Sequence, residues 1–221
     1  MRGSVLLCPL FAGAVLASAV QSAAAPLPRL VVSVAAPADL LAVARELRTS
    51  SGAPFDLVLP AVRVRIGEAV GIPVEAARVT PPELPAGVEP VIHLQLTLGP
   101  VPGTGVDRER EVERQVASII TSLALDSQPA TRLVVEVVDE GPSPDVLPFA
   151  VAALLVRARA ARSGLQASLL LPDGPAFLLT EAGRRLLAYT DGLVLDAGLL
   201  LGDAGSRVEE LAGGRPVAAR V

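Results

Sequence analysis

The sequence lacks lysine, asparagine and tryptophan, and these absences exclude several kinds of chemistry. Without lysine there is no Schiff-base residue, no phosphate-loop lysine and no pyridoxal anchor. Without asparagine there is no acceptor for N-glycosylation. Cysteine occurs once, at Cys8, and histidine once, at His93, so a zinc site of cysteine and histidine ligands is excluded. A carboxylate site for a hard cation is not excluded by composition, but we predict neither a metal nor another cofactor.

Aromatic residues and strong charge are also scarce. Only 2% of the residues are aromatic while 51% are hydrophobic, so the core must be built from leucine, valine and alanine. The net charge is −4 and the acidic residues are dispersed, which does not indicate a nucleic-acid surface. A length of 221 residues is sufficient for one sizeable domain without a second.

Residues 1–24 have the three parts of a secretory signal peptide. Arg2 supplies a positive charge, a nearly continuous apolar run follows at residues 5–20, and small residues come next. Cleavage after Ala19 or after Ala24 fits the small-x-small rule. We therefore predict a secreted or periplasmic protein with no stable membrane span after cleavage. An uncleaved anchor is the alternative, because the apolar run is near the short limit for crossing a bilayer.

From residue 28 onward, strand patterns alternate with helix patterns. Runs of branched residues bounded by turn formers predict strands, and apolar residues at helical spacing predict helices. The segment 67–90 is rich in proline and glycine and is predicted to be an irregular excursion packed on the domain. The predicted strands are 30–36, 55–59 with a continuation to 66, 91–98, 133–138, 166–171, 192–195 and 216–221, and the predicted helices are 40–48, 107–125, 145–162, 180–188 and 206–211.

Repeated strand–loop–helix units predict an α/β protein with parallel strands and right-handed crossovers. Six or seven such units fit a TIM-like (β/α)8 barrel better than an open Rossmann-type sheet, and no glycine fingerprint follows the first strand. A barrel of eight units typically takes about 250 residues. We therefore expect residues 28–221 to form an incomplete barrel, unless the chain is a truncated gene product or a partner supplies the missing part.

The segment TRLVVEVVDEGPSP, residues 131–144, carries the main functional signal. Glu136 interrupts a run of apolar strand residues, and burying a carboxylate is costly unless it is paired or hydrogen-bonded. Glu136 and Glu140 are four residues apart, so they point to the same side of a strand. A barrel whose interior is polar near its C-terminal mouth, where such folds keep their chemistry, explains this arrangement.

Further polar residues are predicted near the same mouth. His93 and Gln95 lie on the polar face of an alternating strand, which would meet solvent in a sandwich and the interior in a barrel. Asp173 and Asp196 follow two later strands. Each has a structural explanation too: Asp173 lies in a Pro-Asp-Gly-Pro turn, Asp196 precedes Ala-Gly, and Glu136 would form a structural bond with His93 or with an arginine.

The secretion signal, the β/α rhythm and a strand ending in VVEVVDEG resemble secreted glycoside hydrolases with (β/α)8 barrels. The resemblance covers the chain from about Leu30 onward. Many of these enzymes use a glutamate that closes strand four as the general acid, and the resemblance implies that role for Glu140. Asp139 stands where many such families have asparagine, and few aromatic residues are present to stack on sugar rings.

The sequence therefore predicts a secreted glycoside-hydrolase-like barrel that acts on a glycan by general acid/base chemistry. The alternative is a non-catalytic, degenerate barrel that serves as an extracytoplasmic binding or scaffold protein, which the scarce aromatic residues favour. A periplasmic α/β ligand-binding lobe with an open sheet is a third interpretation. The predicted catalytic residues are Glu140, Glu136 and Asp196, and the predicted substrate-binding residues are His93, Gln95 and Asp173.

Overall fold

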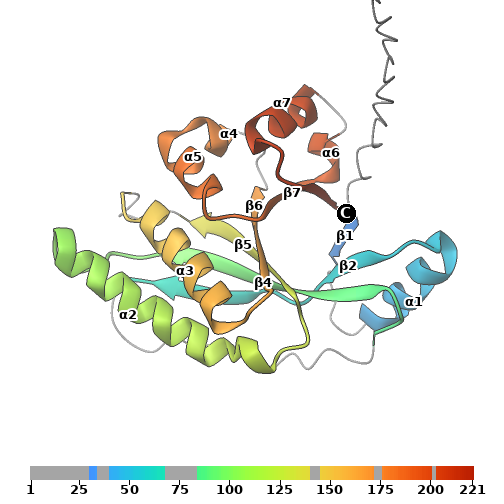
Figure 1. The fold of residues 1–221 in the computed structure, drawn as a ribbon, viewed down its shortest axis with the longest axis horizontal. Coiled ribbons are helices and arrows are strands. Elements are labelled where there is room, and N and C mark those ends of the chain that lie inside the picture. Colours follow the sequence, from blue (N-terminus) through green and yellow to red (C-terminus); the bar gives the residue numbers. More distant parts are fainter. Residues whose placement is uncertain (1–29, 34–39, 68–83, 140–144, 172–175, 201–202) are drawn as a thin grey trace, which may run out of the picture.

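The computed structural model describes residues 30–33, 40–67, 84–139, 145–171, 176–200 and 203–221, in which strands are interspersed with helices along the chain (Figure 1). The predicted signal peptide lies outside these residues. The elements are β1 (Leu30–Ser33), α1 (Leu40–Ser51), β2 (Phe55–Val58), β3 (Val62–Ile66), β4 (Val88–Leu98), α2 (Gly105–Leu123), the 3-10 turn η2 (Leu125–Ser127), β5 (Arg132–Asp139), α3 (Leu147–Ala161), β6 (Gln166–Leu171), α4 (Ala176–Leu179), α5 (Glu181–Leu187), β7 (Gly192–Asp196), α6 (Ala197–Leu200), α7 (Asp203–Ala212) and β8 (Val217–Arg220).

The strands form one parallel sheet that closes on itself. Neighbouring strands follow the order β2-β1-β8-β7-β6-β5-β4-β3, and β2 also pairs with β4. Because β2 and β3 pair with successive parts of β4, the two segments share one position in the ring. The protein is therefore an α/β fold with a closed, parallel, seven-stranded barrel and surrounding helices, which is consistent with the predicted TIM-like class.

The ring closes between the first and the last strand. Val31 pairs with Arg220, the Ser33 amide donates to the Val221 carbonyl at 2.9 Å, and the Val221 amide donates to the Val31 carbonyl at 3.0 Å. The sequence predicts an incomplete ring, but the seven strands close without another unit, because strand tilt and register decide closure together with strand number. The open sheet expected of a ligand-binding lobe is not what the described strands form.

The break between β2 and β3 is centred on Pro60. Val58 pairs with Val91, and Val62 pairs with Leu94. The segment from β2 to β3 therefore has one residue more than the part of β4 that it pairs with. Proline cannot donate to the strand ladder, and an extra residue of this kind bends the strand that carries it. As a result β3 continues along the C-terminal half of β4 rather than beside β1.

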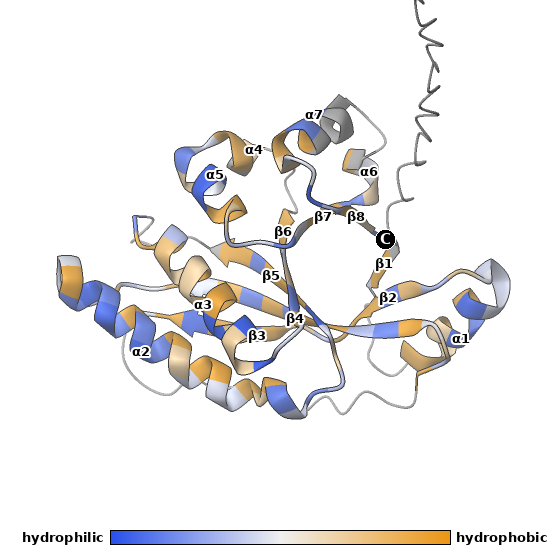
Figure 2. Ribbon diagram, viewed as in Figure 1, coloured by the Kyte–Doolittle hydropathy of each residue, from blue (hydrophilic) through white to orange (hydrophobic). Residues whose placement is uncertain are grey.

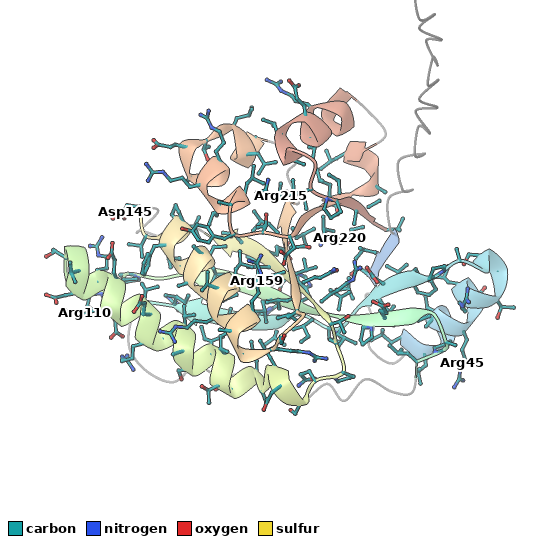
Figure 3. All side chains as sticks on the ribbon, viewed as in Figure 1. Arg45, Arg110, Asp145, Arg159, Arg215 and Arg220 are labelled. Atoms are coloured by element: carbon teal, nitrogen blue, oxygen red, sulfur yellow. The ribbon has the colours of Figure 1, made fainter. Side chains whose placement is uncertain are left out.

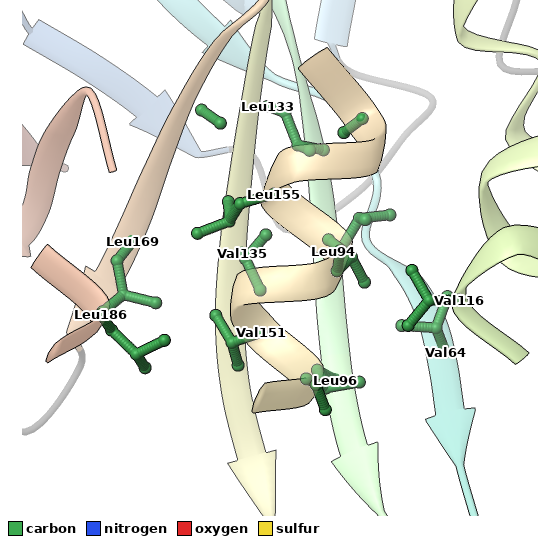
Figure 4. Close-up of a cluster of buried hydrophobic side chains, with 14 of the residues drawn as sticks. Val64, Leu94, Leu96, Val116, Leu133, Val135, Val151, Leu155, Leu169 and Leu186 are labelled. Carbon is green, nitrogen blue, oxygen red and sulfur yellow. The ribbon is translucent and has the colours of Figure 1, made fainter. Parts of the chain in front are cut away.

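The main hydrophobic core lies between the barrel and its helices. The leucines of β4 face outward into this core. Of the two arrangements that the alternating pattern allowed, a sandwich and a barrel, the strand therefore has the one expected in a barrel. Figure 4 shows α3 lying over the neighbouring strands β4 and β5, with Leu94, Val135 and Leu155 among the packed side chains. Helix α3 is hydrophobic over much of its surface, whereas α2 carries more hydrophilic residues (Figure 2), because α3 packs against both α2 and α5.

The interior of the barrel is apolar in its middle and polar toward both ends. Near the N-terminal ends of the strands, Asp56 is fully buried, and its Oδ2 atom lies 2.8 Å from Nη1 of Arg132. Nε of Arg132 lies 3.7 Å from Oε2 of Glu89. This ion-pair group and the apolar layer fill the barrel from the N-terminal ends of its strands to its middle. The apolar layer takes one side chain from each of the seven strand positions: Val31, Val58, Val91, Val134, Leu170, Val194 and Ala218.

Candidate functional site at the C-terminal mouth of the barrel

Glu136 lies at the centre of a polar group above the apolar layer. Its Oε2 atom lies 2.7 Å from Nε2 of His93 and accepts a hydrogen bond of 3.1 Å from Nε2 of Gln95. The fold brings these residues together because Gln95 on β4 and Glu136 on β5 are direct partners in the parallel register, and His93 is two residues back on the same face. The bond between His93 and Glu136, one of two structural partners that the sequence suggested, is therefore present.

His93 is held in its neutral form by burial. Desolvation lowers the pKa of His93 below its ordinary value of 6.5, and the positive charge of Arg220 acts in the same direction, while Glu136 partly opposes both. A neutral imidazole carries one N–H, and an ionised carboxylate can only accept. With the imidazole neutral, the tautomer that carries its proton on Nε2 donates to Glu136.

Asp196 and Arg220 form a second pair at the same level. Asp196 ends β7, Arg220 ends β8, and the two residues are direct partners in the register. Nε of Arg220 donates to Oδ1 of Asp196 at 2.6 Å. Asp196 keeps 40% of its side-chain surface exposed, against 13% for Glu136. One carboxylate is thus open to solvent while the other is largely enclosed.

The two pairs face a common space. Glu136 is on β5 and Asp196 on β7, with only β6 between them. Neighbouring strands lie about 4.8 Å apart, so the two backbones are separated by roughly 10 Å, and side chains directed inward approach more closely than that. Val194 and Ala218 belong to the inner apolar layer, so Asp196 and Arg220, two residues further along β7 and β8, face the same interior.

The structure places four of the six predicted site residues in this layer. His93, Gln95 and Glu136 form one hydrogen-bonded group and Asp196 belongs to the second pair. Glu140 and Asp173 lie outside the described residues. Arg220 was not predicted, although the period of two within the last strand places it on the same face as Ala218.

A metal centre and a membrane span have no support in the described part of the chain. Within those ranges, no three histidine, cysteine, aspartate or glutamate side chains gather in a group that could hold a metal ion. In the same ranges, no helix is both long and apolar enough to cross a bilayer.

Comparisons with known proteins do not identify a family. No protein-family model matches the chain, and no curated protein matches it. Among solved structures, one similar chain is LpCGTa, crystallised in complex with UDP, with 15% sequence identity and a TM-score of 0.33. The match covers 88% of this chain and 53% of the other, so this chain spans about half the length of that protein. The chemistry of the site therefore rests on the residues of this chain.

The arrangement is suited to reactions that use ionised carboxylates beside a neutral imidazole. Glu136 accepts two N–H bonds on one oxygen, which fits a base, a nucleophile or a stabiliser of positive charge rather than a proton donor. Asp196 is ion-paired and partly exposed, so a water molecule or a substrate can reach it.

Proposed function

We propose that the C-terminal mouth of the barrel hydrolyses glycosidic bonds. The observation that carries the proposal is the presence of two carboxylates, Glu136 and Asp196, on the inner side of two strands separated by one other. Glycoside hydrolysis needs a pair of carboxyl groups, about 5–5.5 Å apart in retaining enzymes and about 6.5–9.5 Å apart in inverting ones. In this proposal one of these two carboxylates is the member of the pair that acts at the anomeric carbon, and a third carboxyl group is the acid.

In this proposal the role of Glu140 comes from the resemblance to glycoside hydrolases, and the roles of Glu136 and Asp196 come from their environments. Glu140, which comes directly after the last residue of β5, protonates the departing glycosidic oxygen. Glu136 or Asp196 acts at the anomeric carbon, either by attacking it or by taking a proton from the attacking water. The C–O bond breaks, water supplies the new hydroxyl group, and His93 and Gln95 hold Glu136 in place throughout. We further propose that residues 1–24 direct export, so that the glycan is met outside the cytoplasm.

The test is the release of reducing ends from a panel of oligosaccharides. We expect Glu136→Gln and Glu140→Gln each to lower kcat by about 100-fold to 10,000-fold, the usual contribution of a general acid or base. Glu113→Gln is the matched control, because Glu113 is exposed on α2. Equal activity of Glu136→Gln and Glu113→Gln would contradict the proposal.

A non-catalytic binding barrel is the second candidate. It is favoured by the fact that Glu136 and Asp196 already have partners within the protein, as residues in a structural polar layer would. This function predicts that an oligosaccharide binds without being cleaved, and that Glu136→Gln changes stability more than affinity. Binding measured by calorimetry alongside product analysis distinguishes the two candidates.

A further inference from the structure

Two arginines extend the polar group of the mouth outward along β3. In β3, Val62, Val64 and Ile66 are buried in the helix-side core, whereas Arg63 and Arg65 are exposed. The parallel register pairs Arg63 with Gln95 and Arg65 with Thr97. Paired residues in a sheet project from the same face, so both guanidinium groups belong to the face that carries His93, Gln95 and Glu136.

Within the described ranges, neither Arg63 nor Arg65 forms an ion pair or a side-chain hydrogen bond. Other arginines near the barrel do have such partners: Arg132 bonds Asp56 and Arg220 bonds Asp196. Residues two apart on one strand face are separated by about 6.6 Å, so the two positive charges repel each other. An anion placed between them would relieve this repulsion and would accept hydrogen bonds from both.

The backbone beside Arg65 leaves room for its guanidinium group. A side chain at Gly99 would place its Cβ atom 3.2 Å from Nε and 3.3 Å from Nη2 of Arg65. Gly99 directly follows β4, and its amide donates to the Ile66 carbonyl at 2.6 Å, which fixes the ends of β3 and β4 together. The guanidinium group of Arg65 therefore lies beside the backbone of Gly99 at the rim of the barrel.

We propose that Arg63 and Arg65 bind the acidic group of an anionic sugar, so that the substrate of the mouth is an acidic glycan; this rests on the glycoside-hydrolase function proposed above. Arg63, Gln95 and Glu136 lie in one row across three adjacent strand segments. Two strand spacings amount to about 10 Å. An acidic group held by Arg63 would thus lie about two sugar units away from the carboxylate of Glu136. Carboxylate and sulfate groups both fit the arginine fork.

The experiment compares binding of three oligosaccharides of equal length by calorimetry at low salt: an oligogalacturonate, a sulfated galactan fragment and neutral maltopentaose. We expect an acidic oligosaccharide to bind at least tenfold more tightly than the neutral one, and the identity of the tighter acidic ligand distinguishes carboxylate from sulfate. The double variant R63Q/R65Q should lose this preference. Gly99→Ala should weaken acidic binding by a smaller factor, because the new methyl group displaces the guanidinium of Arg65.

The double variant R45Q/R157Q is the matched control. It removes the same charge from exposed positions on α1 and α3, and Figure 3 shows Arg45 at the periphery of the molecule, away from Arg220. The proposal is overturned if no acidic oligosaccharide is preferred, or if R45Q/R157Q loses the preference equally. Arginine-dependent acidic binding without cleavage would keep this inference and overturn the hydrolase function. Cleavage of neutral glycans without a preference for acidic ones would keep the hydrolase function and overturn this inference.

Discussion

At the scale of single residues, His93 links the chemistry of the mouth to the stability of the fold. Burial lowers its pKa, the neighbouring Glu136 opposes this shift, and Arg220 adds the smallest contribution, which also lowers the pKa. The unfolded chain has no such environment, so its histidine takes up a proton at a higher pH than the folded protein does. Below about pH 6.5 the unfolded state therefore binds more protons, and the free energy of unfolding falls as the pH is lowered toward the folded pKa.

Replacing His93 by glutamine tests this linkage. Glutamine retains an N–H that can bond Glu136, but it does not titrate. We expect the free energy of unfolding of the wild type, measured by urea denaturation and relative to His93→Gln, to decrease between pH 7.5 and pH 5.5. Ionisable groups that do not contact residue 93 are common to both proteins and cancel in the difference. Parallel stability curves over that pH interval would show that His93 keeps its ordinary pKa in the folded state.

At the scale of elements, the ends of β3 and β4 meet through two glycines. Gly67 has a φ of +119°, and a Cβ atom at this position would lie 2.5 Å from the carbonyl carbon of Gly99. The conformation and the close approach both exclude a side chain. This contact matters for the site, because it positions the rim residues of both strands.

Gly67→Ala should therefore cost about 2–3 kcal/mol of unfolding free energy through backbone strain and steric overlap. Gly52→Ala is the control, since Gly52 has a φ of +63° but nothing within 4 Å of the place that a methyl group would take. That change should cost about 1 kcal/mol, from backbone conformation alone. Urea denaturation of both variants measures the difference. Equal decreases in the free energy of unfolding would mean that the close approach of Gly67 to Gly99 does not affect stability.

Most elements could be predicted because their signals are local. The seven predicted strands are present, and β6 has the predicted bounds, since branched residues and turn formers mark its ends. The short helices α4 and α6 were missed because four residues give too little periodicity. Strand β4 begins at Val88, inside the segment predicted to be irregular, because pairing with β2 holds the backbone extended through Pro90.

The candidate site could be predicted only in part. The direction of a side chain follows from the sequence of its own strand, whereas the register between two strands does not. The period of two within each strand placed His93, Gln95 and Glu136 on inner faces. The meeting of Asp196 with Arg220 depends on the alignment of β7 with β8, and the relation of Arg63 to Gln95 depends on the break at Pro60. Neither alignment can be read from a single strand.

At the scale of the whole molecule, closure of the ring depends on the last strand. We expect removal of residues 216–221 to abolish the cooperative thermal transition and to expose the edges of β1 and β7, detected by circular dichroism and by binding of a hydrophobic dye. Removal of residues 1–24 is the comparison, and it should leave the transition unchanged. A cooperative melt at the same temperature in both truncated proteins would mean that β8 contributes nothing to closure.

The pairing of β1 with β8 also sets the order in which the barrel can be assembled during synthesis. The first strand leaves the ribosome early, yet its neighbour on one side is the last strand of the barrel to be made. Until then β1 has an unpaired edge, and long-range contacts of this kind slow the folding of a chain. The edge of β1 that faces β8 is therefore the last part of the barrel wall to be covered.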